Sequence, residues 1–471
     1  MNINKEASII SPDLIISVSR AQSLQREEIR TLHKNYGNAS LVTMLGMLNF
    51  DRQFVRAQGT KLWDSEGHDY LDFLGGYGSL NLGHNHPLVI AAVEQVKEMP
   101  NLMQAGVPTM AAALLHNLAV ITPGKLKRSF LCNSGAEAVE GALKLARAAT
   151  GRKAFIYCQN SFHGKSFGAL SVTGREKYRK PFAPLLEECI EVPFGDIVSL
   201  RQALKKHQAA AFIVEPIQGE GGVNVPPPGY LNEAARACRE AGTLLIADEI
   251  QTGFGRTGAM FACQHENVEP DIMCLAKSLG GGIMPIGAFI TTGEIWNKAY
   301  GSVEKATLHT STFGGNTWAA AAGVAAVEIL VKENLARAAE EKGRYFISGL
   351  KNLQKKYPLI KEVRGRGLLI GIELAQPGGL VDKATMGMAS KLSNEYLGSM
   401  VAGELLNKHR IVTAYTLNNP NVIRLEPPLI VSKEEIDYVL NALEDVLKRH
   451  KGFFSFAATS AKTVLKTIRK K

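Results

Sequence analysis

Apolar and polar positions divide the chain into a regular central part and two more irregular flanks. Between about residues 100 and 325, apolar runs at 154–158, 210–214 and 244–247 alternate with stretches whose apolar residues recur at helical spacing, as at 231–241. Continuous apolar runs are typical of parallel strands that are buried on both faces. The pattern predicts an α/β fold in which helices cover both faces of a large, doubly wound mixed sheet.

The flanks predict a second, smaller domain of α+β type. Residues 53–60 and 62–74 have the pattern of short strands with turn residues between them. After residue 332 the expected elements are a helix at 335–356, a strand at 363–374, a helix at 390–408, a strand at 422–428 and a helix at 433–450. We expect these later strands to share one sheet with residues 50–74.

The chain then divides into five segments. They are a helical arm (1–45), the first part of the small domain (46–75), the large domain (76–332), the rest of the small domain (333–450) and a basic amphipathic tail (451–471). The arm either packs on a partner or over the site, or is a loose leader. The tail puts Phe454, Ala457, Ala461, Val464 and Ile468 on one helical face. It either lies on an acidic membrane surface or a partner, or is a solvated or self-docked terminal helix.

Composition narrows the class of protein. The 471 residues are 45% hydrophobic and 21% charged, which is typical of a globular protein. There is no apolar run of about 18 residues and no signal-peptide pattern at the start. Six scattered cysteines show neither metal-type nor disulfide spacing, so we expect them to be reduced and mostly buried. These features favour the cytoplasm.

The net charge of +10 does not predict a nucleic-acid-binding surface. Residues 448–471 hold eight Lys or Arg and no acid, so the other residues together carry only +2. The positive charge therefore belongs to the tail and not to a patch on the fold.

Two side chains stand where buried strands end. Asp248 closes the strand that begins near Thr243, and Lys277 follows an apolar run and precedes a glycine cluster. Either residue alone is more typical of a helix cap or a solvated loop. Because the carboxyl ends of parallel strands meet at one edge of a sheet, we expect the two side chains to lie together. A carboxylate and an amine there suit pyridoxal 5′-phosphate (PLP), with Lys277 forming the Schiff base and Asp248 keeping the pyridine nitrogen protonated.

A second pattern upstream suits the phosphate of such a cofactor. Ser134 and Glu137 have the spacing of a capping box, and the backbone N–H groups of Gly135 and Ala136 would then open a helix. Phe162 follows a strand and is placed to stack on a flat ring. Tyr77, in a glycine-rich loop, is a candidate for the substrate entrance. His84 and His86 in the same loop have no third ligand nearby, so we expect a turn there and no metal site.

In this order the motifs resemble the class III (ω-amino) PLP-dependent aminotransferases, which have fold type I. The resemblance extends from about residue 25 to 450, and the runs 178–186, 261–272, 280–288 and 417–428 are similar to the members that act on putrescine. Ornithine and acetylornithine aminotransferases are the next most similar members.

The resemblance implies roles for matching positions. Lys277 and Asp248 match the Schiff-base lysine and the partner of the pyridine nitrogen. Other cofactor contacts are implied for Ser134, Gly135, Ala136, Phe162, His163, Gln251 and Thr312. Thr312 would reach the phosphate of the neighbouring subunit, which implies a homodimer with shared active sites, with a tetramer as the larger alternative. Glu220 and Arg424 match a gate, in which Arg424 holds the α-carboxylate of the keto acid and Glu220 pairs with Arg424 at other times.

One position departs from the ornithine-type members. Where they carry an arginine for the distal carboxylate, this chain has Lys165, which lacks a bidentate fork. We therefore expect transfer of the terminal amino group of a diamine (putrescine, with cadaverine as a second candidate) to 2-oxoglutarate, giving 4-aminobutanal and glutamate. The alternatives are an ornithine or acetylornithine aminotransferase, an aminomutase or decarboxylase on the same fold, and a non-catalytic protein of this fold.

Overall fold

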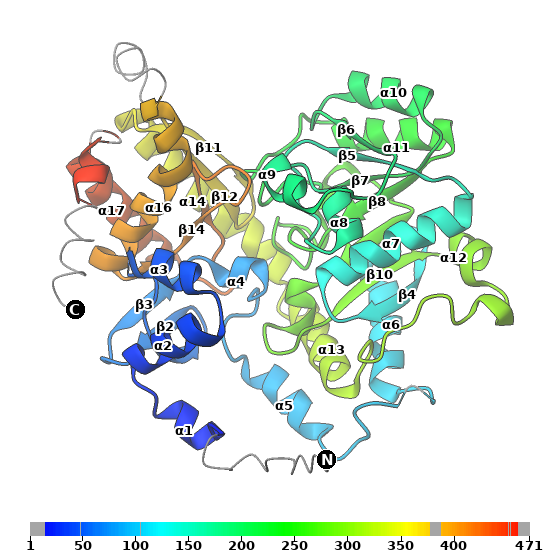
Figure 1. The fold of residues 1–471 in the computed structure, drawn as a ribbon, viewed down its shortest axis with the longest axis horizontal. Coiled ribbons are helices and arrows are strands. Elements are labelled where there is room, and N and C mark those ends of the chain that lie inside the picture. The colour runs from blue at the N-terminus through cyan, green and yellow to red at the C-terminus, as the bar shows by residue number, and fades with distance from the viewer. Residues whose placement is uncertain are drawn as a thin grey trace, which may run out of the picture.

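The computed structural model describes residues 15–47, 49–103, 105–376, 388–450, 452 and 454–459. Figure 1 shows a large part built around one long sheet and, beside it, a smaller part that contains β1–β3 and the C-terminal elements from α14 to α17. This agrees with the predicted α/β class and with the prediction that the first strands join the C-terminal residues.

The large part contains a seven-stranded mixed sheet. Its strands, in spatial order, are β4 (Leu126–Cys132), β10 (Gly287–Thr292), β9 (Ile272–Leu275), β8 (Leu244–Asp248), β7 (Ala209–Val214), β5 (Ala154–Cys158) and β6 (Cys189–Val192). Strand β10 is antiparallel to both of its neighbours, and the pairs from β9 to β6 are parallel. The carboxyl ends of β4, β5, β7, β8 and β9 therefore lie along one edge of the sheet.

Helices cover both faces of this sheet, which confirms the doubly wound arrangement. One layer includes α7 (Gly135–Thr150) and α12 (Gly293–Tyr300), which pack with alternate strand residues such as Phe155 and Ile213. The other layer packs with the intervening residues, such as Ile156 and Phe212. Its helices are α6 (Thr109–Ile121), α10 (Ile197–Lys206), α11 (Tyr230–Ala241) and α13 (Thr317–Lys332). All-apolar strands are required because both faces of the sheet are buried.

The smaller part has two four-stranded sheets, whereas one shared sheet was predicted. The first contains β1 (Phe54–Gln58), β2 (Lys61–Asp64), β3 (Asp69–Asp72) and β13 (Ile411–Val412). The second contains β11 (Ile360–Arg366), β12 (Leu369–Leu374), β15 (Val422–Leu425) and β14 (Ala414–Tyr415). Residues 50–74 thus share a sheet only with β13. The chain separates β13 from β14 within three residues, a switch that alternation alone does not indicate.

Long helices pack on these two sheets. They are α14 (Leu335–Lys356), α16 (Met388–His409) and α17 (Lys433–Arg449), close to their predicted ranges. Four shorter helices lie earlier in the chain. They are α4 (Gly75–Gly78), α5 (Pro87–Gln95), α8 (Phe167–Ser171) and α9 (Glu176–Arg179).

The two ends of the described chain both dock on the smaller part. The arm forms α1 (Val18–Gln22), α2 (Arg26–Tyr36) and α3 (Ala39–Met47), and Arg26 and Arg30 of α2 pair with Asp51. At the other end, residues 454–459 are helical. Phe456 is fully buried and stacks on His450, and Ala457 packs against the core, whereas Phe454 is exposed. Ala461, Val464 and Ile468 lie outside the described residues, so the predicted shared face of the tail remains a prediction.

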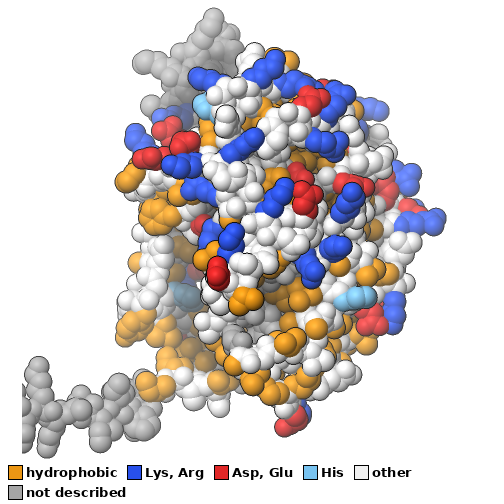
Figure 2. Space-filling model, turned by 90° about the vertical axis from the view of Figure 1, so that its right-hand side faces the viewer, with side chains coloured by type: hydrophobic (Ala, Val, Ile, Leu, Met, Phe, Trp, Pro, Cys, Tyr) orange, Lys and Arg blue, Asp and Glu red, His pale blue; other side chains and the backbone are white. Residues whose placement is uncertain are grey.

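The surface contains no concentrated basic patch on the face shown in Figure 2, where Lys and Arg are interspersed with Asp and Glu and hydrophobic side chains gather towards one edge. All six cysteines are free thiols; five are buried and Cys189 is half-buried. Within the described residues, no helix is long and apolar enough to cross a membrane.

Candidate active site

A cavity of about 620 Å³ opens at the edge where the parallel strands end. Its walls bring together residues far apart in the sequence, from the ends of β4, β5, β8 and β9. The predicted residues that line it are Ser134, Gly135, Ala136, Phe162, His163, Lys165, Asp248, Gln251 and Lys277. The prediction that Asp248 and Lys277 lie together at this edge is confirmed.

Lys277 enters the cavity from a short, tightly turned segment after β9. Its backbone lies in the left-handed region, with φ of 48°, and three glycines follow at 280–282. Burial lowers the pKa of the Lys277 ammonium, although the negative charges of Glu426 and Glu220 oppose this shift. A lowered pKa favours the neutral amine, which is the form that attacks carbonyl groups and accepts protons.

Asp248 is the last residue of β8, and its carboxylate is held in a fixed orientation. Its Oδ2 lies 2.6 Å from Nδ1 of His163, and its Oδ1 accepts a hydrogen bond from the N–H of Ile250 at 3.1 Å. Both Asp248 and His163 are buried. His163 therefore contacts the carboxylate directly. Its other ring nitrogen, Nε2, has no hydrogen-bond partner among the described residues.

The amino terminus of α7 forms another wall. Ser134 caps the helix by accepting a hydrogen bond from the N–H of Glu137 at 3.2 Å. The predicted capping box is only half present, because the Glu137 carboxylate accepts from the N–H of Asn133 instead of Ser134. The N–H groups of Gly135 and Ala136 belong to the first turn, where a helix binds anions.

Phe162 lies in the loop after β5. Its backbone is held by Glu215, a residue to which we gave no role from the sequence. The N–H of Phe162 donates to Oε1 of Glu215 at 2.9 Å, and Oε2 of Glu215 accepts from the N–H of Gly219 at 3.1 Å. Burial raises the pKa of Glu215 to about 7, against the opposing effect of His163. The signal was available, since Glu215 directly follows β7 as Asp248 closes β8.

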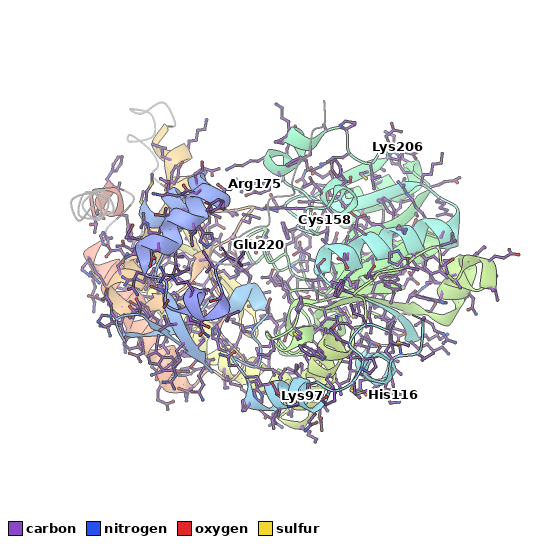
Figure 3. The ribbon with its side chains drawn as sticks, turned by 60° about the horizontal axis from the view of Figure 1, so that its bottom comes forward. Lys97, His116, Cys158, Arg175, Lys206 and Glu220 are labelled. Atoms are coloured by element: carbon purple, nitrogen blue, oxygen red, sulfur yellow. The ribbon has the colours of Figure 1, made fainter. Side chains whose placement is uncertain are left out.

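Arg424 and Glu220 form a buried ion pair between the two parts of the molecule. Nη1 of Arg424, on β15, lies 2.5 Å from Oε1 of Glu220, which follows β7. Figure 3 shows Glu220 and Arg175 in the region where the two parts meet. Burial alone would raise the pKa of Glu220, but Arg424, Lys277 and the N–H of Leu417 together lower it. The Tyr77 ring, about half exposed, lies 5.0 Å from the Arg424 guanidinium.

Glu426 is a second buried glutamate that the sequence did not assign. Nε2 of Gln251 donates to both of its carboxylate oxygens, at 3.0 and 3.2 Å, and Nε of Arg424 lies 3.4 Å away. Gln251 is itself closely packed, because a Cβ at Gly219 would lie 1.7 Å from its Oε1. Residues two apart on a strand share a face, so the spacing of Arg424 and Glu426 was the available signal.

Two of the residues predicted for the site, Lys165 and Thr312, are exposed. Lys165 is exposed on the cavity wall, with its Nζ 4.8 Å from the centre of the Tyr178 ring. Thr312 is exposed and does not line the cavity of its own chain. Its loop is tied to the site by Ser311, whose Oγ accepts a hydrogen bond from Asn133 at 3.1 Å.

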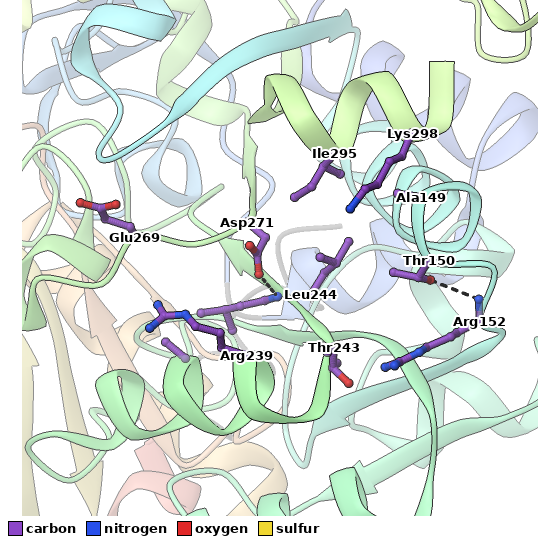
Figure 4. Close-up of a pocket in the computed structure, with 13 residues that line it drawn as sticks. Ala149, Thr150, Arg152, Arg239, Thr243, Leu244, Glu269, Asp271, Ile295 and Lys298 are labelled. Atoms are coloured by element: carbon purple, nitrogen blue, oxygen red, sulfur yellow. Dashed lines mark hydrogen bonds between the residues drawn. The ribbon is translucent and has the colours of Figure 1, made fainter. Parts of the chain in front are cut away.

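A separate cavity of about 360 Å³ lies at the opposite edge of the large sheet, where β8 and β9 begin. Figure 4 shows Leu244, Asp271, Arg152 and Lys298 among the residues around it. None of the residues predicted from the sequence lines this cavity. It lies outside the candidate site.

The residues of the larger cavity fit PLP. They provide an amine with a lowered pKa, an oriented carboxylate and a helix amino terminus for a phosphate. The buried Nε2 of His163 is a polar atom that still needs a partner. The cavity is also within the range of volumes that hold cofactor-sized molecules.

A curated relative of this chain is an aminotransferase. The curated aminotransferase PigE from Serratia sp. (strain ATCC 39006) is 41% identical over 459 residues, which is 90% of this chain and 54% of PigE. The chain therefore spans about half the length of that relative.

Solved structures are similar over most of the chain. The ornithine aminotransferase from Toxoplasma gondii ME49 is 33% identical with a TM-score of 0.79, and the match covers 93% of this chain and 96% of that one. A PLP-bound amine transaminase from an uncultivated Pseudomonas species is 29% identical with a TM-score of 0.76, covering 84% and 95%.

The family model for class III aminotransferases matches residues 46–447, from the end of α3 to the last turn of α17. The chain belongs to the class III aminotransferases, which are PLP-dependent enzymes.

Proposed function

We propose that this aminotransferase moves the terminal amino group of a diamine, with putrescine first and cadaverine second, to 2-oxoglutarate. With putrescine the products are 4-aminobutanal and glutamate. The observation that carries the proposal is Lys165, whose ammonium lies over the Tyr178 ring and offers no bidentate fork to a distal carboxylate. A pocket without such a fork favours an amine that brings no carboxylate.

The ion pair of Arg424 and Glu220 supports the same substrates. The two half-reactions place a carboxylate-free amine and then a keto acid in one pocket. Arg424 is fully buried and would be strongly destabilising without a partner. Glu220 pairs with it while the amine is bound and turns away when the α-carboxylate of 2-oxoglutarate arrives.

We assign the proton transfer to Lys277. Its lowered pKa favours a neutral amine, which can take the proton from the substrate carbon and return it as a general acid. When bound, PLP supplies the carbonyl carbon that captures the amine and a ring that accepts electrons. Asp248 would hold the ring nitrogen protonated, Gln251 the ring hydroxyl, and residues 134–136 the phosphate, with Phe162 stacked on the ring.

We further propose a homodimer in which Thr312 completes the partner's phosphate site. The loop that carries Thr312 exposes Leu308 and Phe313, and Val303 precedes it with a 93% exposed side chain. Such apolar exposure is typical of a surface that a partner covers. We place the enzyme in the cytoplasm, because reduced thiols are typical of that compartment.

A substrate panel tests the proposal. The purified PLP-loaded protein is supplied with 2-oxoglutarate and putrescine, cadaverine, ornithine or acetylornithine, and glutamate is measured. We expect both diamines to exceed the two amino acids. A preference for ornithine or acetylornithine would instead establish the amino-acid alternative, and turnover without a keto acid would establish an aminomutase or decarboxylase.

The matched variant is Lys165→Arg, which adds a bidentate fork at the same place. We expect it to raise the ratio of ornithine to putrescine activity by about tenfold, the value of one good charge-assisted contact. An unchanged ratio would show that position 165 does not set the preference.

A further inference from the structure

Arg424 faces two carboxylates, and the gate accounts for only one of them. Its Nη1 lies 2.5 Å from Glu220, while its Nε lies 3.4 Å from Oε2 of Glu426 on the other side. Arg424 and Glu426 are both fully buried. Nη2 of Arg424 is buried and has no hydrogen-bond partner among the described residues.

The two carboxylates differ in how firmly they are held. Glu220 is in a loop between strands, and its second oxygen accepts a single backbone hydrogen bond, from Leu417 at 2.8 Å. Glu426 continues directly from β15, and its N–H donates to the carbonyl oxygen of Phe73 at 2.8 Å. The Glu220 side chain can therefore turn by giving up one such bond, whereas the backbone of Glu426 is part of the frame.

The side chain of Glu426 is enclosed as well. Both of its oxygens accept from Gln251, and Nε of the fully buried Arg256 lies 3.9 Å away. The Tyr77 loop lies against it, because a Cβ at Gly78 would be 2.4 Å from Oε1 of Glu426. Gly78 has φ of 84°, so the loop approaches Glu426 with a backbone that favours glycine. No free space surrounds this carboxylate for it to turn away.

We propose that Glu426 is a specificity-determining residue: a fixed second counter-ion that keeps Arg424 neutralised when Glu220 turns away. A ligand without a carboxylate can then bind whether Glu220 is paired with Arg424 or turned away from it. This deepens the proposed function and rests on its assignment of Glu220 and Arg424 to the gate.

The first consequence is that the two carboxylates substitute for each other. With either one present, Arg424 keeps a partner; with both absent, a buried charge is left unpaired. We expect Glu220→Gln and Glu426→Gln each to slow the amine half-reaction by no more than about tenfold. The double variant should lose roughly a hundredfold beyond the product of the two.

The second consequence concerns anions. Acetate is small enough to replace a missing carboxylate, so we expect it to restore the double variant by at least about tenfold. It should leave Glu220→Gln nearly unchanged, because Glu426 already neutralises Arg424 there. A merely structural role for Glu426, as support for Gln251 or Arg256, predicts no such rescue.

The test combines rapid mixing with a binding measurement. The amine half-reaction is followed by the absorbance of the bound cofactor in the wild type, both single variants and the double variant, with and without acetate. Glutarate, a dicarboxylate that cannot react, is titrated against the same four proteins. We expect glutarate to bind the double variant at least about tenfold more tightly than Glu220→Gln, since only the double variant has an unpaired Arg424.

Three results would overturn the proposal. They are multiplicative effects of the two substitutions, equal glutarate affinities of the double variant and Glu220→Gln, and strong acetate rescue of Glu220→Gln alone. If the double variant does not fold, as judged by circular dichroism, this last result still decides the matter. Glutarate binding does not depend on the amine substrate, so a protein that fails with diamines disproves the diamine proposal and leaves this test intact.

Discussion

The proposed cofactor end and the proposed substrate end of the site hold their charged groups in different ways. At the cofactor end, Asp248, His163 and Lys277 all come from the large part: Asp248 ends β8, and His163 and Lys277 lie in the segments that follow β5 and β9. At the substrate end, Arg424 and Glu426 come from the smaller part and meet Glu220 from the larger one.

Two glutamates on one loop show the difference. Among the described residues, Glu215 has no cation in hydrogen-bond contact, and burial raises its pKa to about 7. At Glu220, Arg424 together with Lys277 and the N–H of Leu417 lowers the pKa despite burial. Five residues of sequence separate a carboxyl that tends to keep its proton from one that stays ionised. This difference fits the roles we propose for the two ends: proton transfer at the cofactor end and exchange of counter-ions at the substrate end.

The largest expected effect removes the amine at the cofactor end. Lys277→Ala should lower turnover of every substrate by at least about 10⁴-fold, because the chain then lacks the side chain to which we assign both the covalent bond to PLP and the proton transfer. Glutamate formation and the absorbance of the bound cofactor measure the two losses. Lys298→Ala, an exposed lysine paired with Glu294, is the control. Wild-type turnover by Lys277→Ala would contradict the assignment.

The next effect tests whether the carboxylate acts by its charge. Asp248→Asn keeps the shape and an acceptor for the N–H of Ile250, but it no longer holds a proton on the ring nitrogen. We expect a loss of about 10²–10³-fold in both half-reactions. Single-turnover measurements with the amine and with 2-oxoglutarate separate the two. A loss confined to one half-reaction would mean that Asp248 belongs to substrate binding.

A smaller and one-sided effect is expected at the substrate end. Arg424→Lys keeps the charge and loses the planar fork, so the half-reaction with 2-oxoglutarate should fall by about a hundredfold while the amine half-reaction changes by only a few-fold. Single-turnover rates give this split directly. Equal losses in both halves would remove the distinction between the two ends.

The same difference explains how much the sequence predicted. The central sheet and the pair of Asp248 and Lys277 were predictable, because the inner parallel strands are apolar and their last residues must meet at one edge. The contact of Arg424 with Glu220 joins residues about two hundred positions apart, and only the family resemblance suggested it. Glu426 was missed because a carboxylate beside an arginine on one strand is ordinary in sequence and becomes unusual only when both are buried.

Residue spacing along the chain also failed to predict two local details. Ser134 and Glu137 fit a capping box by spacing, yet the Glu137 side chain turns to Asn133, since the loop before α7 offers that N–H as well. The small part splits into two sheets at Thr413, the single residue between β13 and β14, whose Oγ1 donates to the carbonyl oxygen of Arg424. Neither detail follows from hydrophobic periodicity.

Glu215 and Glu220 should also have opposite effects on how the free energy of unfolding depends on pH. Below pH 4.5, Glu215 is protonated in both the folded and the unfolded chain. Between pH 4.5 and about 7 only the unfolded chain releases the proton, so the free energy of unfolding should fall by about 3 kcal/mol as the pH rises. Glu220 behaves oppositely: its stabilisation is complete above pH 4.5 and is lost as the pH falls through its lowered pKa.

Denaturation of the PLP-free protein between pH 3 and 8 should therefore show that Glu215→Gln removes the decline above pH 4.5, while Glu220→Gln keeps that decline and weakens the loss in acid. If Glu215→Gln retains the full decline, burial of this carboxyl is not what distinguishes the cofactor end.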